Sequence, residues 1–275
     1  MPDKPITTLP TSYLFVPADR PERFSKALAS GADRVIIDLE DAVSADSKDD
    51  GRAAIADADL DWSRVAVRIN DATSPFHDDD IALLKTISSP AVMVPKADSA
   101  DMLAAISGAL GNTRQVLPQV ETVKSLFALP DLLAIPGVAR AFFGHLDFAL
   151  DLGSGVDQDA LRHVRSQIVL QSRLAGKPAP VDSVTPDFRN PEAVTADALA
   201  ARNLGFGGKL LIHPAQVEPV RRVFSPSDGD IEWARRVISA MEDSGRGAVS
   251  IDGQMIDRPV EEAAHQILKR AGITI

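Results

Sequence analysis

The chain has 275 residues, of which 45% are hydrophobic and 25% charged, and its formal net charge is −10. A chain of this length and composition can bury a full hydrophobic core without disulfide or metal cross-links. The lack of cysteine excludes disulfides and thiolate metal sites. The acidic balance argues against nucleic-acid and membrane-surface partners, and with neither an apolar leader nor a ~20-residue apolar run we expect a cytoplasmic protein.

Short apolar runs alternate with helix-like stretches along most of the chain. The runs lie at residues 13–16, 34–39, 65–69, 91–94, 116–120, 139–143, 178–181 and 209–212. The helix-like stretches lie at 21–30, 98–110, 159–175 and 191–204, and a glycine follows each of them. Apolar strands alternating with helices indicate a parallel sheet covered on both faces. Eight such units predict an α/β fold, a TIM (β/α)8 barrel; an open doubly wound sheet is the alternative, weakened because no Gly-x-Gly-x-x-Gly follows the first run.

The C-terminal residues follow a different pattern. A helix is predicted over 231–243, a hairpin over 249–256 around Asp252-Gly253, and a last helix from Asp257 to Arg270. We therefore divide the chain into a barrel, residues 1–225, and an extension, residues 226–275. The apolar face of the first helix must be buried, so we expect the extension to pack on the barrel or on a neighbouring subunit.

Charged side chains gather where the predicted strands end. In a barrel, all carboxyl strand ends converge on one mouth. Arg68 is notable because it lies inside an apolar run, where an unpaired charge is costly. The other strand ends carry Asp19-Arg20, Asp38-Glu40-Asp41, Asn70, Lys96, Glu121, Asp147, Asp182 and His213.

Glu121 and Asp147 follow two successive runs and form an oxygen-rich pair of the kind that holds Mg²⁺. Their spacing equally allows simple capping, by Glu121 of the helix at Thr122 and by Asp147 of the turn after Gly144. The five histidines are scattered, which argues against zinc.

Two further basic features have alternative interpretations. Arg20, Arg23 and Lys26 form a stripe near a helix N-terminus, either an anion site or a solvated face. Lys96 is placed as a Schiff-base lysine of an aldolase would be. A serine nucleophile is not supported, because no Gly-x-Ser-x-Gly motif occurs.

Motifs that recur in order over residues 12–270 resemble the citrate lyase β-subunit-like family, part of the HpcH/HpaI aldolase and malyl-CoA lyase superfamily. The resemblance is carried by Tyr-Leu-Phe-Val-Pro-Ala-Asp-Arg-Pro-Glu-Arg-Phe (13–24), Ile-Asp-Leu-Glu-Asp-Ala-Val (37–43), Val-Arg-Ile-Asn (67–70), Val-Pro-Lys-Ala (94–97), Val-Glu-Thr (120–122), Phe-Gly-His-Leu-Asp-Phe-Ala-Leu-Asp-Leu-Gly (143–153), Ile-His-Pro-Ala-Gln (212–216), Phe-Ser-Pro-Ser (224–227), Trp-Ala-Arg-Arg-Val (233–237) and Gly-Gln-Met-Ile-Asp-Arg-Pro-Val (253–260).

This resemblance implies a TIM barrel, Mg²⁺, and carbon–carbon bond chemistry next to a carbonyl. It makes Glu121 and Asp147 the metal ligands and Arg68 the clamp on the carboxylate or keto oxygen of the substrate. Asp41 belongs to the same mouth. Because the family is metal-dependent, the resemblance argues against a Schiff base at Lys96.

The resemblance also implies coenzyme A as part of the substrate. Arg20 and Lys26 fall where relatives contact CoA, and Ile212 and His213 line the same path. Asp257 matches an acid/base aspartate that a neighbouring subunit delivers, although its position also suits an N-cap. The expected assembly is a homotrimer or hexamer.

One departure from the family pattern affects the expected substrate. Many relatives read Gly-Ala-Glu-Asp before the second metal ligand, whereas this chain reads Gly144-His145-Leu146-Asp147. The aspartate is kept, a carboxylate is lost and a histidine is gained.

The predicted function is a Mg²⁺-dependent lyase that cleaves a short β-hydroxyacyl-CoA, of malyl, citramalyl or citryl type, into an acyl-CoA and a keto acid. The alternatives are an aldolase on free 2-keto acids, a malyl-CoA-type thioesterase, and a non-catalytic subunit of a citrate lyase complex.

Overall fold

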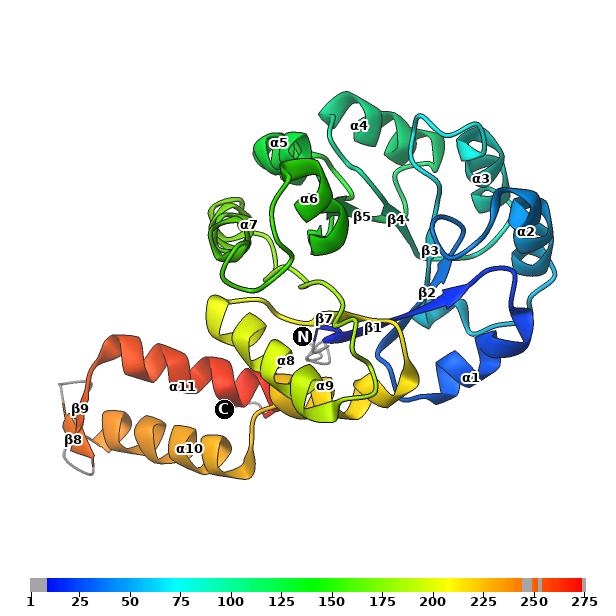
Figure 1. The fold of residues 1–275 in the computed structure, drawn as a ribbon. Coiled ribbons are helices and arrows are strands. Elements are labelled where there is room, and N and C mark those ends of the chain that lie inside the picture. The colour runs from blue at the N-terminus through cyan, green and yellow to red at the C-terminus, as the bar shows by residue number, and fades with distance from the viewer. Residues whose placement is uncertain (1–8, 244–248, 252–253, 274–275) are drawn as a thin grey trace. The chain divides into compact units, whose positions relative to one another are not determined.

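A computed structural model describes residues 9–243, 249–251 and 254–273 of the chain (Figure 1). The described residues divide into two compact units, one of Pro10–Val220 and one of Leu9 with the residues from Arg221 onward. In the described part of the chain, no helix is long and apolar enough to cross a membrane.

The larger unit is built on a seven-stranded sheet in the order β6-β5-β4-β3-β2-β1-β7. Every neighbouring pair in this sheet is parallel. The register places Asp38 beside Arg68, so both side chains start from the carboxyl edge. The strands are β1 (Ser12–Pro17), β2 (Arg34–Asp38), β3 (Val65–Arg68), β4 (Ala91–Val94), β5 (Gln115–Val120), β6 (Phe142–Phe143) and β7 (Lys209–Leu211).

The strand predicted at 178–181 is not formed as a regular strand. Val181 and Asp182 make only isolated parallel bridges, to Phe142 and to Lys209. Pro178 and Pro180 lack backbone N–H groups, which limits ladder formation here. The predicted parallel α/β sheet is confirmed, with seven regular strands where eight were expected.

Helices surround the strands of this unit (Figure 1). Those predicted from sequence are α1 (Phe24–Ala29, after a 3₁₀ turn at Pro21–Arg23), α4 (Ala100–Ala109), α7 (Arg162–Leu174) and α8 (Pro191–Leu204). The others are α2 (Lys48–Ala56), α3 (His77–Leu84), α5 (Val123–Ala134) and α6 (His145–Leu152), and α9 (Val217–Phe224) begins in this unit and runs into the next.

Apolar side chains from the strands pack together in a buried cluster. The polar groups lie at the carboxyl edge of the sheet. Tyr13 meets Phe142 edge to face, with ring centroids 4.9 Å apart. The buried cluster around them draws on every strand and on the bridging segment: Tyr13, Ile36, Ala66, Ala91, Met93, Leu117, Phe142, Val181 and Leu210.

The C-terminal unit contains α10 (Asp228–Asp243), β8 (Val249–Ile251), β9 (Gln254–Ile256) and α11 (Arg258–Arg270). The two strands pair antiparallel, as predicted, while the turn predicted at Asp252-Gly253 lies outside the described residues. The apolar face of α10 is buried inside this unit, against Ile256 and α11, in a cluster of Ala234, Val237, Ile238, Met241, Ile256, Ala264 and Leu268. These contacts bury the apolar face of α10 within the C-terminal unit.

Candidate active site

Arg68, at the end of β3, is held by carboxylates from the end of β2. Its Nε and Nη2 donate to the two oxygens of Asp38 at 2.7 and 2.6 Å. Its Nη1 lies 2.8 Å from Glu40 Oε2 and 3.6 Å from Asp41 Oδ2, and the guanidinium lies 4.8 Å from the Phe15 ring centroid. Burial opposes the charged form, but the adjacent carboxylates, Asp38 first, raise the pKa of Arg68 above its ordinary value. Arg68 therefore keeps its positive charge, and Asp38 and Glu40 already bind part of its guanidinium group.

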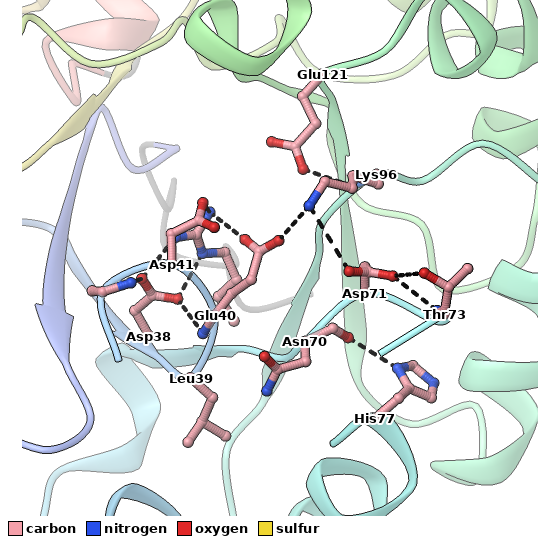
Figure 2. Close-up of polar contacts among 12 residues, drawn as sticks. Asp38, Leu39, Glu40, Asp41, Asn70, Asp71, Thr73, His77, Lys96 and Glu121 are labelled. Carbon is pink, nitrogen blue, oxygen red and sulfur yellow. Dashed lines mark hydrogen bonds and ion pairs between the residues drawn. The ribbon is translucent and has the colours of Figure 1, made fainter. Parts of the chain in front are cut away.

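Lys96 connects this cluster to Glu121 (Figure 2). Its Nζ lies 3.1 Å from Glu40 Oε1 and 3.8 Å from Asp71 Oδ2. Its backbone is left-handed, with φ +45°, and its N–H donates to Glu121 Oε1 at 2.8 Å. Burial would lower the pKa of Lys96, yet the Glu40 charge and hydrogen bond raise it above the ordinary value. A protonated, ion-paired amine is a poor nucleophile, which argues against a Schiff base.

Glu121, at the end of β5, is buried to 1% exposure, and its Oε2 lacks a hydrogen-bond partner among the described residues. Burial, and then the charge of Glu40, raise the pKa of Glu121 to about 8. The helix after it is capped by the Thr122 side chain, with Ser125 closing a capping box, so Glu121 is not the cap. Its carboxylate is therefore left for the site.

Asp147 lies in the first turn of α6, half-buried, and lines a cavity at the carboxyl edge. Its charge acts on Glu121 and raises the pKa of that carboxyl further. An unpartnered, buried carboxylate oxygen near a second carboxylate fits a hard divalent cation such as Mg²⁺. In the described residues, no group of three acidic, histidine or cysteine side chains forms a fuller metal site. Glu121 and Asp147 are thus a pair of carboxylates that could hold such a cation.

The cavity has a volume of about 280 Å³. Arg68, Asp41, Asp147 and Ile212 of the predicted site residues line it together. The other lining residues are Phe15, Asp38, Ala42, Gln119, Gly144, Leu146, Ser183, Val184 and Leu210.

Three predicted CoA-contacting residues are absent from the lining of this cavity. Arg20 and Lys26 are exposed, and Arg20 lies 3.9 Å from the carboxylate of Asp19. His213 is exposed and stacks on Phe188, with ring centroids 4.6 Å apart and planes 21° apart. They are accessible to a large ligand such as CoA.

Asp257 lies in the C-terminal unit, at the N-cap position of α11. Its side chain makes no capping hydrogen bond, although the backbone there is extended as an N-cap requires. The carboxylate is therefore not committed to capping its own helix.

Glu40 was noted from the sequence as a charged strand end and His145 as a departure from the family pattern, but neither was given a role in the site, and Ser183 was not considered. Burial raises the pKa of Glu40 to about 7 against the opposing charge of Arg68. Ser183 Oγ accepts the backbone N–H of His145 at 3.0 Å and lies 2.5 Å from its Nδ1. Burial, and then the charge of Arg165, lower the pKa of His145 to about 4. The acidic cluster after the apolar run at 34–39 could have pointed to Glu40. Ser183 follows the run at 178–181, which is less apolar and gave no comparable signal.

The sequence and the fold both match known proteins. The HpcH/HpaI aldolase/citrate lyase family model matches residues 11–214, and the chain belongs to this family. The chain is 38% identical over 267 residues to the citrate lyase subunit beta-like protein of Mycobacterium tuberculosis (strain CDC 1551 / Oshkosh), covering 94% of this chain and 95% of that protein. It is 32% identical over 269 residues to the (3S)-malyl-CoA thioesterase of Cereibacter sphaeroides (strain KD131), with 94% of each covered.

A solved structure extends the match to three dimensions. Protein CitE from Mycobacterium tuberculosis, in complex with magnesium, acetoacetate and coenzyme A, superposes with a TM-score of 0.86. It is 36% identical, and 97% of this chain and 99% of that chain are covered. The recognised family is therefore confirmed, together with an α/β fold of its type.

Proposed function

We propose that this protein is a Mg²⁺-dependent carbon–carbon lyase that cleaves a short β-hydroxyacyl-CoA into an acyl-CoA and a keto acid. The observation that carries the proposal is the unpartnered, buried Oε2 of Glu121 near Asp147, beside a cavity that Arg68 lines. Membership of the aldolase/citrate lyase family and the magnesium, acetoacetate and coenzyme A bound to the related CitE protein support it.

The proposal includes a closed (β/α)8 barrel over residues 1–225, with residues 226–275 packing on it or on a neighbouring subunit. Closure is supported by backbone hydrogen bonds on both sides of the bridging segment. The N–H of Val181 donates to Ala141 and that of Asp182 to Gly208, each at 2.9 Å. The barrel brings every carboxyl strand end to the mouth that the site needs.

Glu121 and Asp147 would hold Mg²⁺, which, when bound, supplies Lewis-acid polarisation of substrate oxygens. Arg68 keeps N–H donors beyond those engaged by Asp38, and these orient the substrate carboxylate or keto oxygen. Asp41 lines the cavity and lies 3.6 Å from Arg68 Nη1, which supports a role for Asp41 in accepting the proton of the substrate hydroxyl.

Lys96 and Glu40 would position the other residues of the site and take no part in bond making or breaking. The Lys96 N–H fixes one oxygen of Glu121, which leaves the other for the cation. Asp257, supplied by a neighbouring subunit of a homotrimer or hexamer, would exchange the proton at the carbon released by bond cleavage.

A second candidate is hydrolysis of the same thioester, because one relative is named a (3S)-malyl-CoA thioesterase. Both reactions use the same metal, cavity and substrate class, and they differ in which bond breaks. An aldolase acting on free 2-keto acids and a non-catalytic subunit of a citrate lyase complex are the remaining alternatives.

The test is a panel of malyl-, β-methylmalyl-, citramalyl- and citryl-CoA incubated with purified protein and Mg²⁺. We expect at least one thioester to be cleaved, with activity lost on chelation and restored by Mg²⁺. Glu121→Gln should be inactive, and the matched control is Glu192→Gln, an exposed glutamate of α8. Turnover that survives chelation, or that persists in Glu121→Gln, would remove the metal site from the proposal.

A further inference from the structure

The residues that line the cavity include a charged set and an uncharged set. The charged residues are Asp38, Asp41 and Arg68, at or just after the ends of β2 and β3, and Asp147 of α6. Leu146, Ser183, Val184, Leu210 and Ile212 are uncharged, and we call them the uncharged wall. Its members come from α6, from the segment after the bridging residues, and from the end of β7.

The residues that line the cavity supply one positively charged side chain, which suffices for one substrate carboxylate only. Arg68 is the sole cation among the lining residues, all of which belong to the described part of the chain. Asp38 and Glu40 already offset its charge, with Asp38 engaging both Nε and Nη2. Lys96 does not line the cavity and is paired with Glu40. A second substrate carboxylate therefore meets no free positive charge from these residues.

Ser183 is the one polar side chain of the uncharged wall, and its hydroxyl is already hydrogen-bonded to His145. The Oγ atom accepts the His145 N–H at 3.0 Å and lies 2.5 Å from Nδ1. His145 is buried and does not line the cavity. A hydroxyl shared in this way offers at most one neutral hydrogen bond, which does not compensate a buried carboxylate.

We propose that the uncharged wall receives an uncharged, methyl-sized substituent on the keto carbon, so that the site accepts 2-keto acids with one carboxylate and discriminates against dicarboxylates. This inference rests on the proposed function and narrows its substrate. Of the candidate thioesters, it favours those that release a monocarboxylate over citryl-CoA, which releases a dicarboxylate. Ser183 and the apolar residues beside it are then specificity-determining residues.

Direct binding tests this inference without turnover. Pyruvate and freshly prepared oxaloacetate are titrated into the full-length protein with Mg²⁺ by calorimetry, and each sample is checked by NMR for decarboxylation. We expect pyruvate to bind at least about tenfold more tightly, the factor that corresponds to about 1.4 kcal/mol for an uncompensated carboxylate.

A charge-gain variant tests the wall itself. Leu146 is 44% exposed, so Leu146→Lys tolerates the new charge, and it should bring the pyruvate-to-oxaloacetate ratio toward unity. Leu146→Met is the matched control and should leave the ratio unchanged.

The outcomes separate this inference from the function it rests on. Oxaloacetate binding as tightly as pyruvate, or a ratio that Leu146→Lys leaves unchanged, overturns the inference while leaving the proposed lyase intact. If neither keto acid binds in the presence of Mg²⁺, the proposed function fails and the inference fails with it.

Discussion

Arg68 is a charged side chain that ends an otherwise apolar strand, and its surroundings explain why it is tolerated. Asp38 lies beside it in the sheet register and accepts two of its hydrogen bonds. Glu40 adds a further ion pair, and Phe15 covers the guanidinium plane. A buried cation paired in this way keeps its charge and a fixed orientation at the cavity.

Arg68→Lys tests whether that orientation matters for the reaction. A lysine keeps the positive charge but lacks the planar fork that spans both oxygens of Asp38. We expect the kcat/KM for the best thioester to fall by about 100-fold or more, as for loss of an oriented transition-state donor. Arg162→Lys, at an exposed position in α7, is the control. Near-normal turnover in Arg68→Lys would mean that Arg68 has only a structural role.

The raised pKa values of Glu121 and Glu40 predict how stability depends on pH in the metal-free protein. Above about pH 4.5 the unfolded chain loses these protons, while the folded protein keeps them up to about pH 7 for Glu40 and about pH 8 for Glu121. The unfolded state then binds fewer protons, so the free energy of unfolding should fall as the pH rises through this window.

Urea denaturation at several pH values in this window, with chelator present, measures this dependence. Glu121→Gln should flatten the slope because it removes one titrating group. An unfolding free energy that rises with pH in the wild type, with no change of slope in Glu121→Gln, contradicts the assigned protonation states.

At the scale of elements, local signals predicted the positions of many strands and helices. The helix predicted over 191–204 from the glycine that follows it has the same bounds in the structure, where Asn190 caps its first turn and Gly205 follows with φ +103°. Strand positions followed from apolar runs such as 91–94, whose residues are all buried. These features depend on near neighbours in the chain, which is why sequence alone indicates them.

Pairings between distant segments were not predictable in the same way. The engagement of Arg68 by Asp38 depends on the register of β2 and β3. The contact of Ser183 with His145 depends on a bridging segment that the prolines keep irregular. The family resemblance pointed to Glu121 and Asp147, whereas the unpartnered oxygen of Glu121 appears only once the Lys96 N–H is placed.

Gly144, the N-cap residue of α6, lies between the two proposed metal ligands in the sequence and gives a prediction at this scale. A Cβ there would lie 2.7 Å from Glu121 Oε2 and 2.9 Å from the Gln119 amide nitrogen. Gly144→Ala should therefore displace Glu121 and weaken Mg²⁺ binding, measured by calorimetry, while circular dichroism still reports a folded protein.

Gly108→Ala is the matched control, because a Cβ at this position in α4 meets no atom within 4 Å. It should leave Mg²⁺ binding unchanged and raise the stability by up to about 1 kcal/mol. Equal Mg²⁺ affinity in Gly144→Ala and Gly108→Ala would contradict the position assigned to the cation.

At the scale of the whole molecule, the proposed acid/base Asp257 and the cavity belong to different compact units. If a neighbouring subunit supplies Asp257, then a mixture of Asp257→Ala and Arg68→Ala chains should recover part of the lost activity. Each mixed interface then pairs an intact cavity with an intact Asp257. The measurement is activity after the two variants are mixed under conditions that exchange subunits.

Each variant assayed alone is the control for this experiment. A complete lack of rescue after demonstrated exchange indicates independent sites within each chain. A monomer in solution, seen by light scattering, excludes a shared site altogether.

The central claim is that this site breaks a carbon–carbon bond, and NMR identification of the products tests it most directly. The thioester turned over fastest in the panel is incubated with the wild-type protein and Mg²⁺. The account predicts an acyl-CoA and a keto acid in equal amounts, and neither product with Asp147→Asn. Free coenzyme A together with the intact hydroxy acid would contradict it, because those products come from hydrolysis of the thioester.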